Sequence, residues 1–144
     1  MVRSALVVDA GPLYAYVDVS DRHHAACRTL LETHSGPLVA PILAVGEAVY
    51  LIGRHLGPGA EVRFLADLVE GTFAIESVHG VDWIRMAALV ARYRDFPLGT
   101  VDASVVAVAE RLGVTRIATT DRRHFSAVRP LHVAAFELLP QPLG

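Results

Sequence analysis

The stretch SALVVDAGPL, residues 4–13, places one carboxylate, Asp9, directly after the apolar run ALVV. A short Val-rich run that ends at Ala-Gly-Pro is typical of a strand buried on both faces, as in a parallel sheet. Gly11 permits a sharp turn and Pro12 suits a first helical position, so a helix is predicted over 13–17. Ligands of open α/β sheets bind outside the carboxyl ends of the strands, which predicts that Asp9 faces a site. The alternative is that Asp9 only caps the helix.

The composition predicts one densely packed domain over residues 1–144. The chain is 53% hydrophobic with a mean hydropathy of +0.41, yet no run approaches the roughly 20 apolar residues of a bilayer span. No charged leader with a long apolar segment opens the chain, so we expect a cytoplasmic protein with no membrane partner. The single cysteine, Cys27, rules out an intramolecular disulfide and a cysteine-built zinc site.

The charged residues exclude two classes of chemistry. All 13 basic residues are arginines and 15 residues are acidic, which gives a net charge of −2. Such a charge does not indicate a nucleic-acid binder, although a local basic face can still bind one. Because the chain contains no lysine, a phosphate-binding loop of the GxxxxGK[ST] type and Schiff-base catalysis are excluded.

Strand-like and helix-like patterns alternate along the whole chain. This order predicts an α/β fold with a mainly parallel sheet of four or five strands and helices on both faces. The predicted strands are 5–9, 38–40, 72–75, 115–119 and 133–138. The predicted helices begin at residues 13, 21, 42, 62, 81 and 101.

The helix predicted after Gly80 carries apolar residues at helical spacing and arginines along or near its polar side. Such a face is usually only solvated, but near a site of acids its arginines could guide phosphates. The apolar set is Ile84, Ala87, Ala88 and Ala91, and the arginines are Arg85, Arg92 and Arg94.

Three further acids occupy unusual positions. Glu47 is the only charge in the helical segment 43–52, so it requires a partner if it is buried, unless it lies on an exposed edge of that helix. Gly46 beside it leaves room for another element or a ligand. Asp102 is predicted in the first turn of an apolar, central helix capped by Thr100, where the helix dipole favours an anion. Asp121 lies at the carboxyl end of the strand at 115–119, as Asp9 lies at the carboxyl end of its own strand.

A cluster of these four carboxylates would repel itself unless cations bind. Mg²⁺ and Mn²⁺ are the usual ions for sites built only from oxygen ligands. Two such ions, roughly 3.5 to 4 Å apart, can activate a water and stabilise the leaving oxygen of a phosphodiester. The sequence leaves open whether one ion or two bind.

The blocks LVVDAG, VGEAVYLI, YRDFPLGTVDASVVAVAERLG and TRIATTDRRHF resemble, in order and spacing, the PIN-domain ribonucleases. More narrowly they resemble the VapC toxins of bacterial toxin–antitoxin pairs, over nearly the full length. The resemblance implies a PIN-like three-layer α/β/α fold and a metal-dependent endoribonuclease. It also implies a homodimer and a VapB-like antitoxin as partner.

The resemblance also assigns roles to single residues. Mg²⁺ or Mn²⁺ would be held around a hydrolytic water, with a hydroxyl of Thr119 or Thr120 in support. The fourth acid varies in this family, so the role of Asp121 as a direct ligand stays open. The implied ligands are Asp9, Glu47, Asp102 and Asp121.

The residues around the last acid lead to further expectations. Arg122 and Arg123 are expected to meet RNA phosphates, because arginine offers a bidentate fork. His124 is expected to pack over a buried Phe125 rather than to act as a general base. Three aromatic residues are candidates for stacking on RNA bases or for the core: Tyr14, Tyr16 and Trp83.

Two other functions are compatible with parts of this sequence. A phosphatase of haloacid-dehalogenase type also places an Asp after its first strand, but it requires a second Asp where this chain has Gly11. A non-catalytic PIN-like binding module is the other alternative, and the intact acids argue against it. The high apolar content predicts leftover hydrophobic surface and hence a homodimer.

Overall fold

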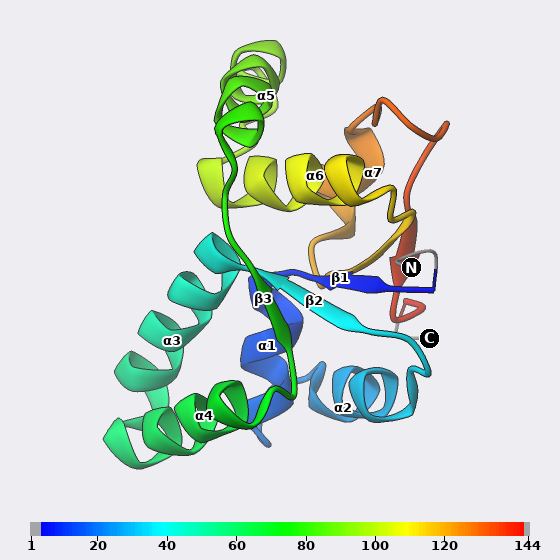
Figure 1. Ribbon diagram of the computed structural model, residues 1–144. Coiled ribbons are helices and arrows are strands. Elements are labelled where there is room, and N and C mark those ends of the chain that lie inside the picture. Colours follow the sequence, from blue (N-terminus) through cyan, green and yellow to red (C-terminus); the bar gives the residue numbers. More distant parts are fainter. Residues whose placement is uncertain (1–3, 143–144) are drawn as a thin grey trace.

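The computed structural model describes residues 4–142 and contains a five-stranded, all-parallel sheet in the order β3-β2-β1-β4-β5 (Figure 1). The predicted parallel α/β architecture is therefore confirmed. The strands are β1 (Leu6–Val8), β2 (Leu38–Pro41), β3 (Ala74–Glu76), β4 (Arg116–Ala118) and β5 (Glu137–Leu139).

Seven helices cover the two faces of the sheet within residues 4–142. In Figure 1, α1, α2 and α4 lie below the sheet and α5, α6 and α7 lie above it, while α3 packs mainly with α1 and α4 and also touches α6. None of these helices is both long and apolar enough to cross a membrane. Their bounds are α1 (Ala10–Val17), α2 (His24–Thr33), α3 (Ile42–Leu56), α4 (Pro58–Glu70), α5 (Gly80–Arg92), α6 (Thr100–Leu112) and α7 (Arg122–Ala127).

The central strand β1 joins two hydrophobic cores because its side chains alternate between the faces of the sheet. Val7 packs in the core on the α6 side, and Leu6 and Val8 pack in the core on the α1 side. The whole strand is buried. This explains why the apolar run ALVV is continuous rather than alternating, and it fixes the position of the residue that follows.

Helix α6 is the buried helix that the sequence predicted. Every residue from Ala103 to Ala109 is buried, and these small side chains let the helix lie close to the sheet. The helix ends at Gly113, which adopts a left-handed conformation with φ of 70°. Its N-cap is Gly99 rather than Thr100, so the predicted cap is wrong by one residue.

Two local predictions near the strand ends are corrected. Helix α1 begins at Ala10, before Pro12, and Gly11 has no positive φ. A Cβ on Gly11 would instead collide with the hydroxyl of Thr120, so glycine is needed for close approach rather than for a turn. Strand β5 covers only Glu137–Leu139, because these three residues are the ones that pair with β4.

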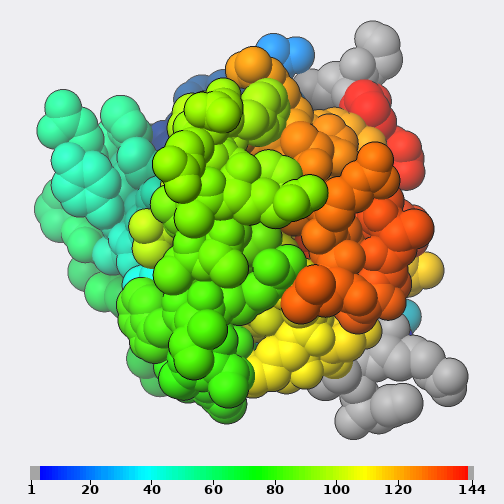
Figure 2. All heavy atoms as spheres, turned by 90° about the horizontal axis from the view of Figure 1, so that it is seen from above, coloured from blue at the N-terminus to red at the C-terminus, as the bar shows by residue number. Residues whose placement is uncertain are grey.

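The orientation of α5 differs from the prediction. The apolar set chosen from the sequence is exposed, with Ile84 at 75%, whereas Asp82, Met86 and Leu89 are buried. Ion pairs attach this helix to α6: Arg85 to Glu110 at 2.7 Å, and Asp82 to Arg111 at 3.0 Å. Helix α5 therefore presents an apolar outer surface, and Figure 2 shows it as the ridge nearest the viewer.

Candidate active site at the carboxyl edge of the sheet

The candidate site lies where the two central strands β1 and β4 end. Asp9 follows β1 and Thr119 follows β4, and the backbone N–H of Asp9 donates to the carbonyl of Ala118 at 2.9 Å. From β1 the chain passes to β2 on one side, whereas β4 lies on the other side. This is the topological switch point at which open α/β sheets bind ligands.

Asp9 is a buried carboxylate at 6% exposure. Burial and the nearby charge of Asp102 raise its pKa to about 7, against the opposing effect of a hydrogen bond from Thr119. The Asp9 side chain makes no capping hydrogen bond to α1. Asp9 does occupy the N-cap position of α1, and a hydrogen bond from the Ala10 backbone lowers its pKa, but capping alone does not account for a buried carboxylate of raised pKa. That Asp9 faces a site stays a prediction.

Glu47 is exposed on α3, so the expectation of a buried, partnered glutamate is wrong and the exposed-edge alternative holds. Its charge nevertheless contributes to raising the pKa values of both Asp9 and Asp102. A Cβ on Gly46 would meet no atom within 4 Å. The helix surface beside Glu47 is thus open, with room for a ligand rather than for another element of this fold.

Asp102 lies in the first turn of α6, as predicted. Burial raises its pKa, and so do the charges of Asp121 and Glu47, while His124 opposes the shift. The positive end of the helix dipole also favours an anion here. The electrostatic coupling therefore links all four predicted acids, although they come from four separate parts of the chain.

Thr119 connects two of the acids. Its hydroxyl donates to Asp9 Oδ2 at 2.9 Å and accepts the backbone N–H of Asp121 at 2.9 Å. These bonds fix the direction of the hydroxyl and one oxygen of Asp9. Of the two threonines considered, Thr119 makes these bonds, while Thr120 packs against Gly11.

His124 holds Asp121 through two contacts. Its backbone N–H donates to Asp121 Oδ1 at 3.1 Å, and its Nδ1 lies 2.8 Å from Asp121 Oδ2. The ring also lies against Phe96, with 4.8 Å between centroids, and Phe125 is buried as expected. The sequence analysis did not identify Phe96, because its partners Arg123 and His124 lie more than 25 residues further along the chain. Its only signal in the sequence is its place in the block YRDFPLG.

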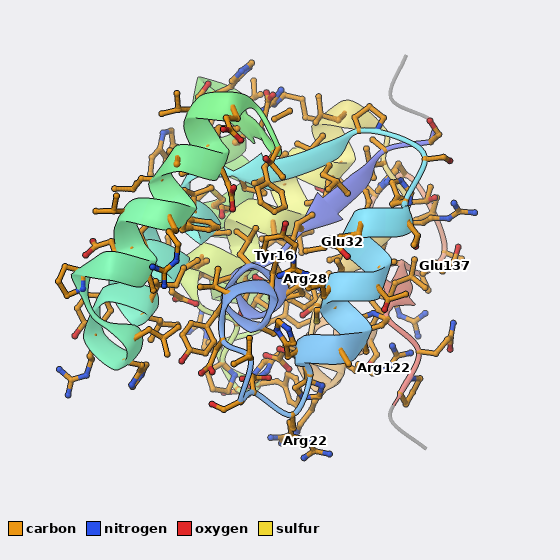
Figure 3. The ribbon with its side chains drawn as sticks, turned by 90° about the horizontal axis from the view of Figure 1, so that it is seen from below. Tyr16, Arg22, Arg28, Glu32, Arg122 and Glu137 are labelled. Atoms are coloured by element: carbon orange, nitrogen blue, oxygen red, sulfur yellow. The ribbon has the colours of Figure 1, made fainter. Side chains whose placement is uncertain are left out.

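The two arginines after Asp121 have different surroundings. Arg122 Nη1 donates to the carbonyls of Leu138 and Pro140, both at 3.0 Å, which fastens α7 to β5 (Figure 3). Arg123 is exposed, and its guanidinium lies 4.8 Å from the Phe96 ring centroid. Arg122 therefore has a structural role, and Arg123 is the one free to meet a ligand.

The three aromatic candidates for stacking on RNA bases have different surroundings. Tyr14 donates to Asp18 Oδ2 at 2.6 Å. Tyr16 packs edge-on against Phe73, and the guanidinium of Arg28 covers its ring at 5.1 Å (Figure 3). Trp83 is half exposed on α5. The two tyrosines thus belong to the packing of α1.

The donor set suits a hard divalent cation. All four acids offer oxygen ligands, and burial together with the charges of other acids in this set raises the pKa values of Asp9 and Asp102. As the side chains stand, no three Asp, Glu, His or Cys residues within 4–142 are gathered closely enough to hold one ion.

Known proteins share both the sequence and the fold. Residues 6–130 match the PIN domain family. The chain is 32% identical to Ribonuclease VapC26 of Mycobacterium tuberculosis over 135 residues, which is 94% of this chain and 100% of that protein.

Two solved structures have the same fold. The crystal structure of Mycobacterium tuberculosis VapC20, described as a sarcin-ricin loop cleaving toxin, superimposes with a TM-score of 0.79 at 22% identity, covering 90% of this chain and 98% of that one. DNA-bound VapBC from Salmonella typhimurium gives 0.67 at 14% identity, covering 94% and 96%. By its sequence and its fold, the chain belongs to the PIN-domain family and, within it, to the VapC ribonucleases.

Proposed function

We propose that this chain is the toxin of a toxin–antitoxin pair and acts as a metal-dependent endoribonuclease that hydrolyses RNA phosphodiesters. One observation carries the proposal: Asp9 is buried, its pKa is raised to about 7, and the charges that raise it are those of Asp102 and Glu47. Buried charges normally have a partner of opposite sign. A bound cation is the partner that an RNA hydrolase of this family would use.

The proposed ligands of Mg²⁺ or Mn²⁺ are Asp9, Glu47, Asp102 and Asp121. A divalent ion supplies a water of lowered pKa and a counter-charge for phosphate oxygens. The protein contributes orientation: Thr119 fixes one oxygen of Asp9, and His124 fixes both oxygens of Asp121. Such supporting bonds typically change metal affinity or activity by 10- to 100-fold.

The test is cleavage of a panel of labelled RNAs in chelator, in Mg²⁺ and in Mn²⁺, with p-nitrophenyl phosphate as a monoester control. We expect RNA cleavage only with a divalent ion, and none by Asp9→Asn or Asp102→Asn. Asp67→Asn, on α4 across the sheet, is the matched control and should cleave normally. Hydrolysis of the monoester alone would indicate a phosphatase, and RNA binding without cleavage would indicate a binding module.

The proposed partners are RNA, a VapB-like antitoxin and a second copy of the chain, all in the cytoplasm and through one domain over 1–144. The outer surface of α5 supports the homodimer, because its exposed apolar side chains suit an interface. These side chains are Val81, Trp83, Ile84 and Val90. Light scattering at micromolar concentration checks this, and a monomer there would count against it.

We further propose that the antitoxin inhibits by presenting a basic side chain to the acid cluster. A guanidinium can replace the charge of a metal ion beside paired carboxylates. The purified complex should then contain less bound metal than the free toxin, as measured by elemental analysis. A complex that is inhibited while it retains all its metal and remains open to RNA would contradict this mechanism.

A further inference from the structure

A row of side chains in contact leads from the surface to the acids of the candidate site. The guanidinium of Arg123 lies 4.8 Å from the Phe96 ring centroid, and that ring lies 4.8 Å from the ring of His124. His124 in turn contacts Asp121 at 2.8 Å. The row joins α7 to the loop between α5 and α6, and Figure 2 shows these two segments side by side.

The outer end of this row is locally basic, although its inner end is Asp121 and the chain as a whole is acidic. Segment 122–132 contains three arginines and no acid, and segment 92–96 contains two arginines and one acid. Tyr93 joins the two segments, since its hydroxyl accepts the backbone N–H of Arg129 at 2.9 Å. Four exposed arginines here make no ion pair within residues 4–142: Arg92, Arg94, Arg123 and Arg129.

Phe96 holds the guanidinium of Arg123 in place. An arginine on an aromatic ring is attracted by the ring's negative face, and it keeps its outer face and its N–H edges free. The ring of His124 also contacts the Phe96 ring, so Phe96 and Arg123 are already in position before any ligand binds. A pre-positioned planar cation loses less side-chain freedom on binding than a mobile one does.

The chemistry of this surface fits unpaired RNA. Proteins that recognise single strands stack bases on aromatic rings and on guanidinium planes, whereas bases in a duplex are hidden from such contacts. Resting on the proposed ribonuclease function, we infer that Arg123 stacks on an unpaired base next to the phosphate that is cleaved. Phe96 acts as the positioning residue, and together they favour single-stranded over double-stranded RNA.

The experiment measures binding of a short, labelled, single-stranded RNA of mixed sequence by fluorescence anisotropy, with Ca²⁺ in place of Mg²⁺. Arg123→Ala and Arg123→Lys should each weaken binding by about tenfold, because lysine keeps the charge but lacks the plane. Arg63→Ala removes an exposed arginine on α4, across the sheet (Figure 1), and should change binding by less than about twofold. Wild-type affinity in Arg123→Lys would overturn the stacking role and leave only an ionic contact.

The role of Phe96 needs a readout that a purely structural role would not move. Phe96→Leu should raise KM for RNA cleavage in Mg²⁺ by about threefold to tenfold with kcat unchanged, and Phe96→Tyr should restore KM because it restores the ring. Equal KM values in all these variants would overturn the inference while leaving the ribonuclease function intact. Failure of the wild type to cleave any RNA would instead overturn the proposed function itself.

Discussion

Two buried aspartates on either side of α6 have opposite electrostatic states. Asp82, at 2% exposure, accepts hydrogen bonds from Arg111 Nε and from the backbone N–H of His79. Burial alone would raise its pKa, but these contacts hold it below its ordinary value. Among residues 4–142 Asp9 has no basic partner, and its pKa is raised to about 7. Asp82 is therefore a structural acid with a basic partner, whereas Asp9 is the acid for which we propose a bound cation as the partner.

The largest difference between the two acids should be in catalysis. Asp9→Asn is expected to lower kcat/KM for RNA cleavage by at least about a thousandfold, because a proposed metal ligand is lost. Asp82→Asn should cleave RNA at close to the wild-type rate wherever it remains folded. Steady-state cleavage in Mg²⁺, at a temperature where circular dichroism shows both variants folded, checks this. Equal losses in the two variants would remove the distinction.

The two substitutions should change the free energy of unfolding in opposite directions. With metal chelated, the raised pKa of Asp9 costs up to about 4 kcal/mol above pH 7, since ionising a carboxyl of pKa about 7 is harder than ionising one of 3.8. Asp9→Asn should recover part of this cost. Asp82→Asn should lose about 1 to 3 kcal/mol, because Arg111 loses one of its two carboxylate partners and keeps Glu76 at 2.8 Å. Urea unfolding at fixed protein concentration measures both.

The pH dependence follows with a definite sign. Between pH 3.8 and about 7 the folded protein binds more protons at Asp9 than the unfolded chain does, so stability in chelator should fall as pH rises through this window. Asp9→Asn should flatten that fall. The lowered pKa of Asp82 acts the other way, because its stabilisation is lost only in acid as the pH falls through its folded pKa. A wild-type curve without the fall would mean that Asp9 is not ionised against a penalty.

The stability gained on binding a metal ion should depend on Asp9 and not on Asp82. Mn²⁺ at about 100 times its dissociation constant should add about 2.7 kcal/mol to the wild type and much less to Asp9→Asn. Asp82→Asn, although weaker overall, should gain as much as the wild type. Thermal unfolding with and without Mn²⁺ gives these increments. A full gain by Asp9→Asn would exclude Asp9 from the metal site.

The same pair of regions shows what the sequence can predict. Asp9 was identified because a strand buried on both faces has a continuous apolar pattern, and the acid ends it. Asp82 was not identified, because its partner Arg111 lies 29 residues away on another helix. The apolar face of α5 was misassigned for the same reason: ion pairs to α6 choose which side is buried, and helical spacing alone cannot reveal them.

The four acids of the candidate site also differ in how far local sequence predicts their positions. Strand ends and helix starts are local features, so Asp9, Asp102 and Asp121 could be placed at the edge of the sheet from their own neighbours. Glu47 lies in mid-helix, where its exposure depends on which turn of α3 faces α6, and its predicted burial was wrong. The hydrogen bond from Thr119 to Asp9 joins residues 110 positions apart, so no local pattern indicates it. Only the resemblance to the PIN-domain ribonucleases implied a supporting role for this threonine.

The smallest expected effect separates two adjacent threonines. Thr119→Val keeps the shape of a residue that is 1% exposed but removes its bonds to Asp9 and to the Asp121 backbone. Asp9 then loses the donor that favours its charged form, and a backbone N–H loses its acceptor. RNA cleavage should fall by about 10- to 100-fold, with a loss of about 1 to 3 kcal/mol in unfolding free energy. Thr120→Val, whose side chain only packs against Gly11, should change neither quantity appreciably. If Thr120→Val impaired cleavage as much as Thr119→Val, the contrast would come from packing at the end of β4, and the hydroxyl of Thr119 would have no special part in orienting Asp9.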